Sequence, residues 1–98
     1  MLNIINKSPL DRNALQSCID AATGGAILLI EDGVYAATRG SAFEAKLKAA
    51  QGTYKLFALG PDIDARGFGD RVMDGVTVVD YAGFVDLVTE HKTCQSWL

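Results

Sequence analysis

Four short apolar runs, separated by segments with helical spacing, limit the fold of this 98-residue chain more than any other feature. The runs cover residues 2–5, 26–30, 54–59 and 76–79. Strands that alternate with helices in this way favour βαβ units and therefore a parallel sheet. The run at 26–30 is apolar throughout, as expected of a strand that is covered on both faces. We therefore expect a three-layer α/β/α protein with a flavodoxin-like, mostly parallel sheet and helices on both faces.

The first two expected helices have recognisable ends. Ser8 and Pro9 are typical of a helix start, because a serine caps the helix and a proline in the first turn loses no hydrogen bond. This helix should end before the glycines at 24–25, which are typical C-caps. A second helix is predicted from Ser41 and Glu44, which have the spacing of a capping box.

The last expected helix begins after Asp80, a good N-cap residue. Tyr81, Phe84 or Val85, and Val88 follow at helical spacing, so we expect them to face the core. With this helix the expected fold is complete, at four strands and three helices.

The segment after the third strand has the character of a loop without reactive groups. Residues 60–68 begin with Gly60 and Pro61, which are typical of a turn, and contain no cysteine, histidine or serine. In the flavodoxin-like strand order 2-1-3-4 this loop would face residues 6–8 across the switch point, where ligands of open α/β sheets bind. A strand end without a nucleophile or general base indicates that a partner supplies the chemistry.

Composition excludes several classes of protein. The net charge is −3 and the nine basic residues are dispersed, so there is no basic stripe for direct nucleic-acid binding. The longest apolar stretch, residues 26–30, is far shorter than the roughly 20 residues that cross a bilayer. Two cysteines without a C-x-x-C motif fit a reducing compartment better than a disulfide or zinc site. We expect one soluble, cytoplasmic domain over residues 1–98, with no metal or cofactor.

Six segments, in order along nearly the whole chain, resemble one protein family. They are NKSP at 6–9, EDGVYAA at 31–37, LGPD at 59–62, ARGF at 65–68, VDYAGFVDL at 79–87 and QSWL at 95–98. Together these segments closely resemble the DsrH/TusB family. The resemblance implies the flavodoxin-like fold that DsrH shares with the related DsrE and DsrF subunits.

Members of the DsrH/TusB family are the smallest subunits of heterohexameric sulfurtransferases. The resemblance implies a dimer of heterotrimers with DsrE/TusD-type and DsrF/TusC-type subunits, in which a cysteine relay passes persulfide sulfur to a DsrC/TusE-type carrier protein. One branch serves 2-thiolation of the tRNA wobble uridine, and the other serves cytoplasmic sulfur oxidation. The sulfur-carrying cysteine of the family follows a strand of the DsrE/TusD-type subunit, and residues 60–68 of this chain lack it. The resemblance thus implies an accessory subunit.

Cys18 is the residue of this chain that could carry sulfur. Its place in the first helix resembles a cysteine in DsrH of sulfur oxidisers that TusB commonly lacks, which favours the DsrH branch. A persulfide carrier needs a thiolate, whereas Cys18 shares an apolar stripe with Leu15 and Ala22, late in a helix whose dipole does not favour one. Two functions remain open: a relay subunit with Cys18 as carrier, and a structural interface subunit with a buried Cys18. Cys94, in the tail, is expected to be an accessible surface thiol.

Three large apolar residues are candidates for contacts between subunits. Trp97 and Leu98 end the chain and need a site of burial, either on this domain or on a neighbouring subunit. Phe68 stands between two glycines in the expected loop, where an aromatic residue can anchor a subunit contact. Alternatively, Phe68 covers the core of its own domain.

The remaining titratable residues have structural explanations. His91 could act as a general base, but a cation is favourable at the end of a helix in any case. Four acidic residues lie near strand ends, as in the magnesium site of a receiver domain: Glu31, Asp32, Asp62 and Asp80. That site also needs an acidic pair after the first strand and a lysine after a fifth strand. Turns and helix caps therefore explain these acidic residues better than a receiver-like metal site does.

Overall fold

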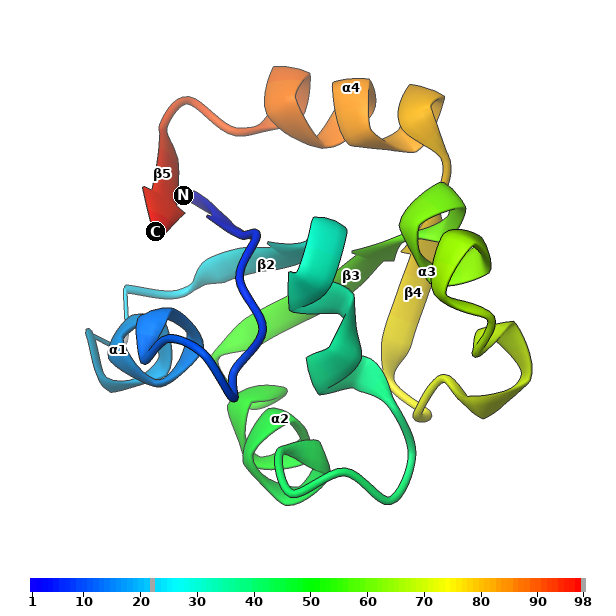
Figure 1. The fold of residues 1–98 in the computed structure, drawn as a ribbon. Helices are drawn as coiled ribbons and strands as arrows, with labels where there is room; N and C mark the ends of the chain where they lie inside the picture. The colour runs from blue at the N-terminus through cyan, green and yellow to red at the C-terminus, as the bar shows by residue number, and fades with distance from the viewer. Residues whose placement is uncertain (22, 98) are drawn as a thin grey trace.

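The computed structural model describes residues 1–21 and 23–97, and its centre is one sheet of five parallel strands (Figure 1). The strands are β1 (Leu2–Ile5), β2 (Gly25–Leu29), β3 (Tyr54–Leu59), β4 (Val76–Val79) and β5 (Cys94–Trp97). Their spatial order is β4-β3-β2-β1-β5, so β4 and β5 form the two edges. The predicted α/β class with a parallel sheet is confirmed.

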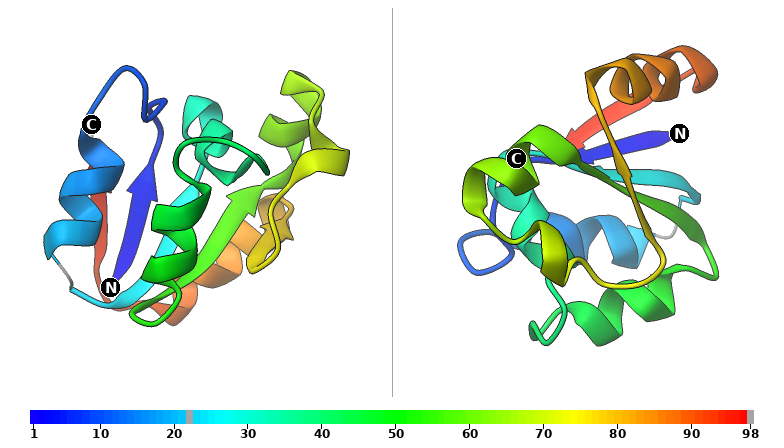
Figure 2. Two further views of the ribbon diagram at one scale, coloured as in Figure 1. Left: turned by 90° about the horizontal axis from the view of Figure 1, so that it is seen from below. Right: turned by 90° about the vertical axis from the view of Figure 1, so that its right-hand side faces the viewer.

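Helices cover the two faces of the sheet unequally. They are α1 (Ala14–Ala21), α2 (Glu44–Ala50), α3 (Gly60–Arg66) and α4 (Tyr81–Glu90), with two short 3-10 helices, η1 (Glu31–Ala37) and η2 (Gly69–Arg71). Figure 2 shows α4 alone on one face, whereas α1 and α2 lie on the other. A helix is about 10 Å across and strands lie about 4.8 Å apart, so α4 spans about two strands. No helix among the described residues is long and apolar enough to cross a membrane.

The sheet divides the core into a large and a small half. Because successive residues of a strand point to opposite faces, Ile27 and Leu29 enter the large half, and Ala26 and Leu28 enter the small half. Buried residues of α1, η1 and α2 complete the large half. In the small half, the buried residue from α4 is Leu87. One face is therefore covered thickly and the other thinly.

The predicted strand order 2-1-3-4 is wrong. In the structure β2 lies between β1 and β3, and the second neighbour of β1 is β5, which the sequence pattern did not predict. This strand escapes prediction because its residues, CQSW, contain no apolar run, and the first three are exposed. Residues 6–8 and 60–62 consequently do not face each other across a junction between β1 and β3.

Two local signals lead to elements other than those predicted. The first helix begins at Ala14 and not at Ser8. The Ser8 hydroxyl accepts a hydrogen bond from the N–H of Leu10 at 3.2 Å and so stabilises a turn. The segment that begins with Gly60 and Pro61 forms helix α3 and not a loop, since the first N–H groups of a helix need no intrahelical partner.

Helix α4 begins where predicted but presents a different side to the core. The Asp80 carboxylate caps it by accepting a hydrogen bond from a backbone N–H of the first turn at 2.8 Å. The prediction that Tyr81 and Val88 face the core is wrong, because they are 62% and 41% exposed. Of the two alternatives between them, Phe84 packs against the small half of the core, and Val85 is 62% exposed. Since α4 alone covers this face, only the side directed at the sheet is buried.

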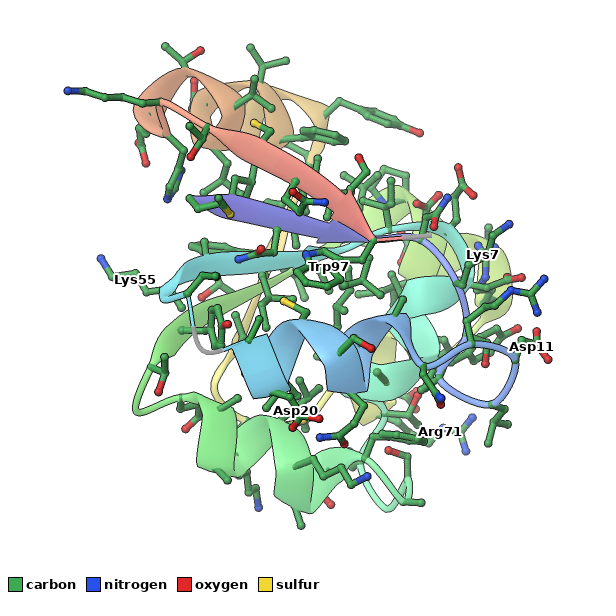
Figure 3. The ribbon with its side chains drawn as sticks, turned by 90° about the vertical axis from the view of Figure 1, so that its left-hand side faces the viewer. Lys7, Asp11, Asp20, Lys55, Arg71 and Trp97 are labelled. Atoms are coloured by element: carbon green, nitrogen blue, oxygen red, sulfur yellow. The ribbon has the colours of Figure 1, made fainter. Side chains whose placement is uncertain are left out.

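One buried side chain joins the last strand to the middle of the sheet. Asn3 of β1 is fully buried, and its Nδ2 donates to the carbonyl oxygen of Ala26 in β2 at 3.1 Å. Its Oδ1 accepts a hydrogen bond from the indole Nε1 of Trp97 in β5 at 3.1 Å. Figure 3 shows Trp97 on the face of the sheet that α1 covers. Asn3 thereby links β2, β1 and β5.

Substitution of Trp97 by phenylalanine tests this link. Trp97→Phe keeps an aromatic ring but leaves the buried Oδ1 of Asn3 without a donor, which should lower the free energy of unfolding by about 1–3 kcal/mol. Urea denaturation measures the loss. Ser96→Ala, a change at an exposed residue of the same strand, is the control and should alter stability by about 0.5 kcal/mol at most. Equal stability of the two variants would contradict the role given to this hydrogen bond.

Candidate functional site

A short hydrogen bond holds together the connections that follow β2 and β3. Glu31, the first residue of η1, has a φ of 49°, in the left-handed region that non-glycine residues rarely adopt. Its N–H donates to Oδ2 of Asp62 in α3 at 2.6 Å. Because a hydrogen bond to a carboxylate is stronger than one between neutral groups, Asp62 stabilises this strained turn.

An ion pair makes a second connection between η1 and α3. The Nη2 and Nε of Arg66 lie 2.7 and 3.0 Å from Oδ1 of Asp32. This hydrogen-bonded carboxylate raises the pKa of Arg66. The guanidinium carbon also lies 5.8 Å from the ring centre of Tyr35, whose ring is 5.5 Å from that of Phe68. An exposed pair of this kind adds at most about 1 kcal/mol to stability.

These contacts account for the acidic residues near the strand ends. Asp62 and Asp32 hold the turn and the ion pair, Glu31 contributes its backbone N–H, and Asp80 caps α4. Within residues 1–21 and 23–97, no group of three or more His, Cys, Asp or Glu side chains is placed to hold a metal ion. His91 follows α4, and its Nδ1 lies 2.8 Å from a carbonyl oxygen of that helix.

Cys18 lies in the large half of the core with none of its surface exposed. Burial raises the pKa of its thiol to about 11, although the neighbouring Tyr54 side chain acts in the opposite direction. The Tyr54 hydroxyl donates its proton to the carbonyl oxygen of Cys18 at 2.8 Å. Leu15, from the same predicted stripe, is buried as well, whereas Ala22 lies outside the described residues. At neutral pH Cys18 is a protonated packing residue.

The two cysteines lie on opposite faces of the sheet. Cys94 is exposed in β5 and pairs in register with Leu2, whose side chain belongs to the small half of the core. Cys18 belongs to the large half, below α1. Because the sheet separates them, sulfur cannot pass directly from one thiol to the other within this fold.

The three candidate interface residues have different surroundings. Phe68 is 2% exposed and packs in the large half of the core, so its ring offers almost no surface to a partner. Trp97 is half-buried against the same core and is bound by Asn3. It therefore docks on its own domain. Leu98 lies outside the described residues.

Sequence reasoning misses two hollows at the carboxyl ends of the strands. One, of about 590 Å³, is lined by Gly60, Pro61, Asp64, Val78, Val79, Asp80 and Gly83. The other, of about 450 Å³, is lined by Ser8, Leu10, Asp11, Asp32, Tyr35, Thr38 and Ser41. Each contains two carboxylates, and neither lining includes a cysteine, histidine, lysine or arginine among the described residues. The sequence signals for this edge were the segment that begins with Gly60 and Pro61, which line the first hollow, and the aspartates near several strand ends.

Two solved structures share this fold. The ychN protein from E. coli matches with a TM-score of 0.76 over 97% of both chains, at 15% sequence identity. A protein of unknown function from Methanobacterium thermoautotrophicum, MTH1491, matches with a TM-score of 0.72 over 97% of this chain and 96% of that chain, at 19% identity. At such identities the likeness concerns the fold alone, and it defines the chain as a flavodoxin-like α/β domain.

The chain belongs to the DsrH family. The family model described as "DsrH like protein" matches residues 7–94. Protein TusB of Photorhabdus laumondii is 37% identical over 99% of this chain and all of that protein. Protein TusB of Salmonella dublin is 42% identical over 76% of both chains. The resemblance to DsrH/TusB is confirmed, and membership makes the chain a subunit of the sulfur-relay class.

Thiol alkylation tests the placement of Cys18. A pKa of about 11 leaves about one thiol in ten thousand ionised at pH 7, and burial blocks the reagent as well. In the folded protein a maleimide should therefore modify Cys94 alone, and it should modify both thiols in urea. Cys94→Ser provides the control, since it should leave the folded protein unmodified. Rapid native labelling of that variant would contradict the buried position.

The same pKa shift predicts a pH dependence of stability. The unfolded thiol loses its proton near pH 9, whereas the folded one keeps it to about pH 11. The contribution of Cys18 is therefore complete below pH 9 and is lost as the pH rises from about 9 to 11. Cys18→Ala should remove this part of the alkaline decline in the unfolding midpoint.

The Asp62 contact can be tested with a neighbour as control. Asp62→Ala removes the acceptor of the Glu31 N–H and should lower the free energy of unfolding by about 1–3 kcal/mol. Asp64→Ala changes an exposed aspartate of the same helix, for which a loss of about 0.5 kcal/mol or less is expected. Both are measured by thermal and urea unfolding. If the two variants were equally stable, Asp62 would not stabilise the turn.

Proposed function

We propose that this chain is the smallest subunit of a DsrEFH/TusBCD-type sulfurtransferase and has a structural role there, with no sulfur-carrying thiol of its own. It assembles in the cytoplasm with DsrE/TusD-type and DsrF/TusC-type subunits as a dimer of heterotrimers. The complex passes persulfide sulfur to a DsrC/TusE-type carrier, in tRNA wobble uridine 2-thiolation or in sulfur oxidation. This chain itself makes no direct contact with nucleic acid.

The complete burial of Cys18 carries this proposal. Persulfide transfer requires a thiolate that attacks a sulfur atom of the donor, so the attacking group must be both ionised and accessible. Cys18 is neither at neutral pH. Within residues 60–68, which follow β3, no cysteine is available to replace it. Cys94 is exposed, but it begins β5 at the amino end of the parallel strands, opposite to the strand end that residues 60–68 follow. In this proposal the acceptor and donor cysteines of the relay belong to the other subunits.

A relay role for Cys18 is the second candidate, and its support is the resemblance of this helix cysteine to that of DsrH. In that role α1 would have to move away from the sheet before each transfer. Such a movement would expose Leu15 together with the thiol and would break the hydrogen bond from Tyr54 to the Cys18 carbonyl. The loss of this burial is a free-energy cost that every transfer would incur.

Mass spectrometry of the loaded complex decides between the two. After incubation of the three-subunit complex with a persulfide donor, the structural role predicts no added sulfur on this chain and added sulfur on the DsrE/TusD-type subunit. The Cys18→Ala, Cys94→Ser double variant should support transfer to the carrier at the wild-type rate, within about twofold. As the control, replacement of the cysteine of the DsrE/TusD-type subunit should abolish transfer.

Loss of transfer with the double variant, in a complex that still assembles, would favour the relay role. Single variants would then show which of the two thiols is required.

A further inference from the structure

The larger hollow lies at the open edge of the sheet, where β4 has a neighbouring strand on one side only. Its floor is formed by Val78 and Val79 of β4, and its walls by the starts of α3 and α4. Figure 1 shows these two helices beginning near the same end of β4. The hollow of about 590 Å³ is therefore built from β4, from α3, which packs in the large half of the core, and from α4, which packs on the small half.

Two glycines set the shape of this hollow. A Cβ atom on Gly60 would lie 3.2 Å from Cγ1 of Val78 and 3.3 Å from the carbonyl oxygen of Val79. A Cβ atom on Gly83 would lie 2.8 Å from Cβ of Val79. Because larger residues would push α3 or α4 away from β4, the absence of side chains at both positions maintains the close approach of the helices.

The charge of the hollow has one sign. Asp64 and Asp80 contribute its two ionisable side chains, and both residues are exposed. The two ion pairs found among the described residues, Lys48 with Glu44 and Arg66 with Asp32, involve neither of them. One oxygen of Asp80 caps α4, and the second oxygen is not used in the cap. An apolar hollow with two carboxylates attracts a cation.

One exposed apolar side chain lies in the hollow, and another follows Asp80 in the sequence. Val78, in the floor of the hollow, is 49% exposed, and Tyr81, which follows Asp80, is 62% exposed. Aromatic residues beside apolar ones are typical anchors of protein interfaces. The combination suits a long side chain with an apolar stem and a cationic end.

We propose that this hollow receives an arginine or lysine side chain of a partner subunit. The partner is a subunit of the sulfurtransferase complex, so this inference rests on the proposed function. The stem of the basic side chain packs on the apolar lining at Val78, its charged end binds Asp64 and Asp80, and the partner surface around it covers the exposed Tyr81. A second copy of this chain suits the site less well than a partner with a basic surface, because the net charge of −3 on each copy opposes their approach.

The test uses the full-length chain together with its DsrE/TusD-type and DsrF/TusC-type partners. Asp64→Asn with Asp80→Asn removes both charges and keeps the cap of α4, because asparagine caps helices as well as aspartate does. The matched control is Asp20→Asn with Asp74→Asn, two exposed acids outside the hollow, at the end of α1 and before β4. The site double variant should bind the partners about tenfold more weakly or worse, with a smaller dependence on salt. The control should bind like the wild type.

Tyr81→Gln tests the apolar part of the surface. It should weaken binding of the partners without changing the dependence on salt, since no charge is altered. If the site double variant unfolds, Asp64→Asn alone provides the test, because it leaves the cap of α4 untouched.

Several results would overturn the inference. They are wild-type binding by the site double variant, equal weakening by the control, or a complex that assembles normally and loses only its affinity for the carrier. Self-association of the wild-type chain that the site double variant abolishes would assign the hollow to a second copy instead. If the wild-type chain failed to bind the two partner subunits at all, the proposed function would fall together with the inference, whereas the other results leave that function intact.

Discussion

The last crossover determines much of this structure. Because all strands are parallel, the chain must return across the sheet after each strand, and from β4 it returns to the opposite edge beside β1. One helix, α4, makes this connection and is the only cover of its face within the described residues. This arrangement explains why one half of the core is small and why one side of α4 is exposed. It also leaves β4 at the open edge of the sheet.

β1, β2, β3 and β4 were predictable, because each of these strands has an apolar run. β5 was not, since its stability comes from pairing with β1 and from the Trp97 contact with Asn3, two residues at opposite ends of the sequence. One local sequence signal was also compatible with two different structures. Gly60 and Pro61 are compatible with a turn or with a helix start, and only packing against β4 selects the helix.

The candidate site, like the fold, was predictable from the sequence only in part. The stripe that contains Leu15 and Cys18 correctly indicates a buried helix face, because helical spacing is a property of the sequence itself. The contacts at the carboxyl ends of the strands could not be predicted in this way. The bond from the Glu31 N–H to Asp62 and the hollow beside Asp64 and Asp80 join segments that come together only in the folded chain. The sequence predicted Asp80 as a helix cap, which is confirmed, but it could not show which groups Asp62 and Asp64 would meet.

The position of β5 beside β1 also affects how this protein folds. The two strands pair although they come from opposite ends of the described residues, and only this pairing gives the amide of Leu2 its bond to the carbonyl of Thr93 at 2.9 Å and the side chain of Asn3 its bond from Trp97. Contacts between distant parts of a chain form slowly, because the entropy of closing the long loop is lost before the contact is gained. We therefore expect β5 to join the sheet late in folding.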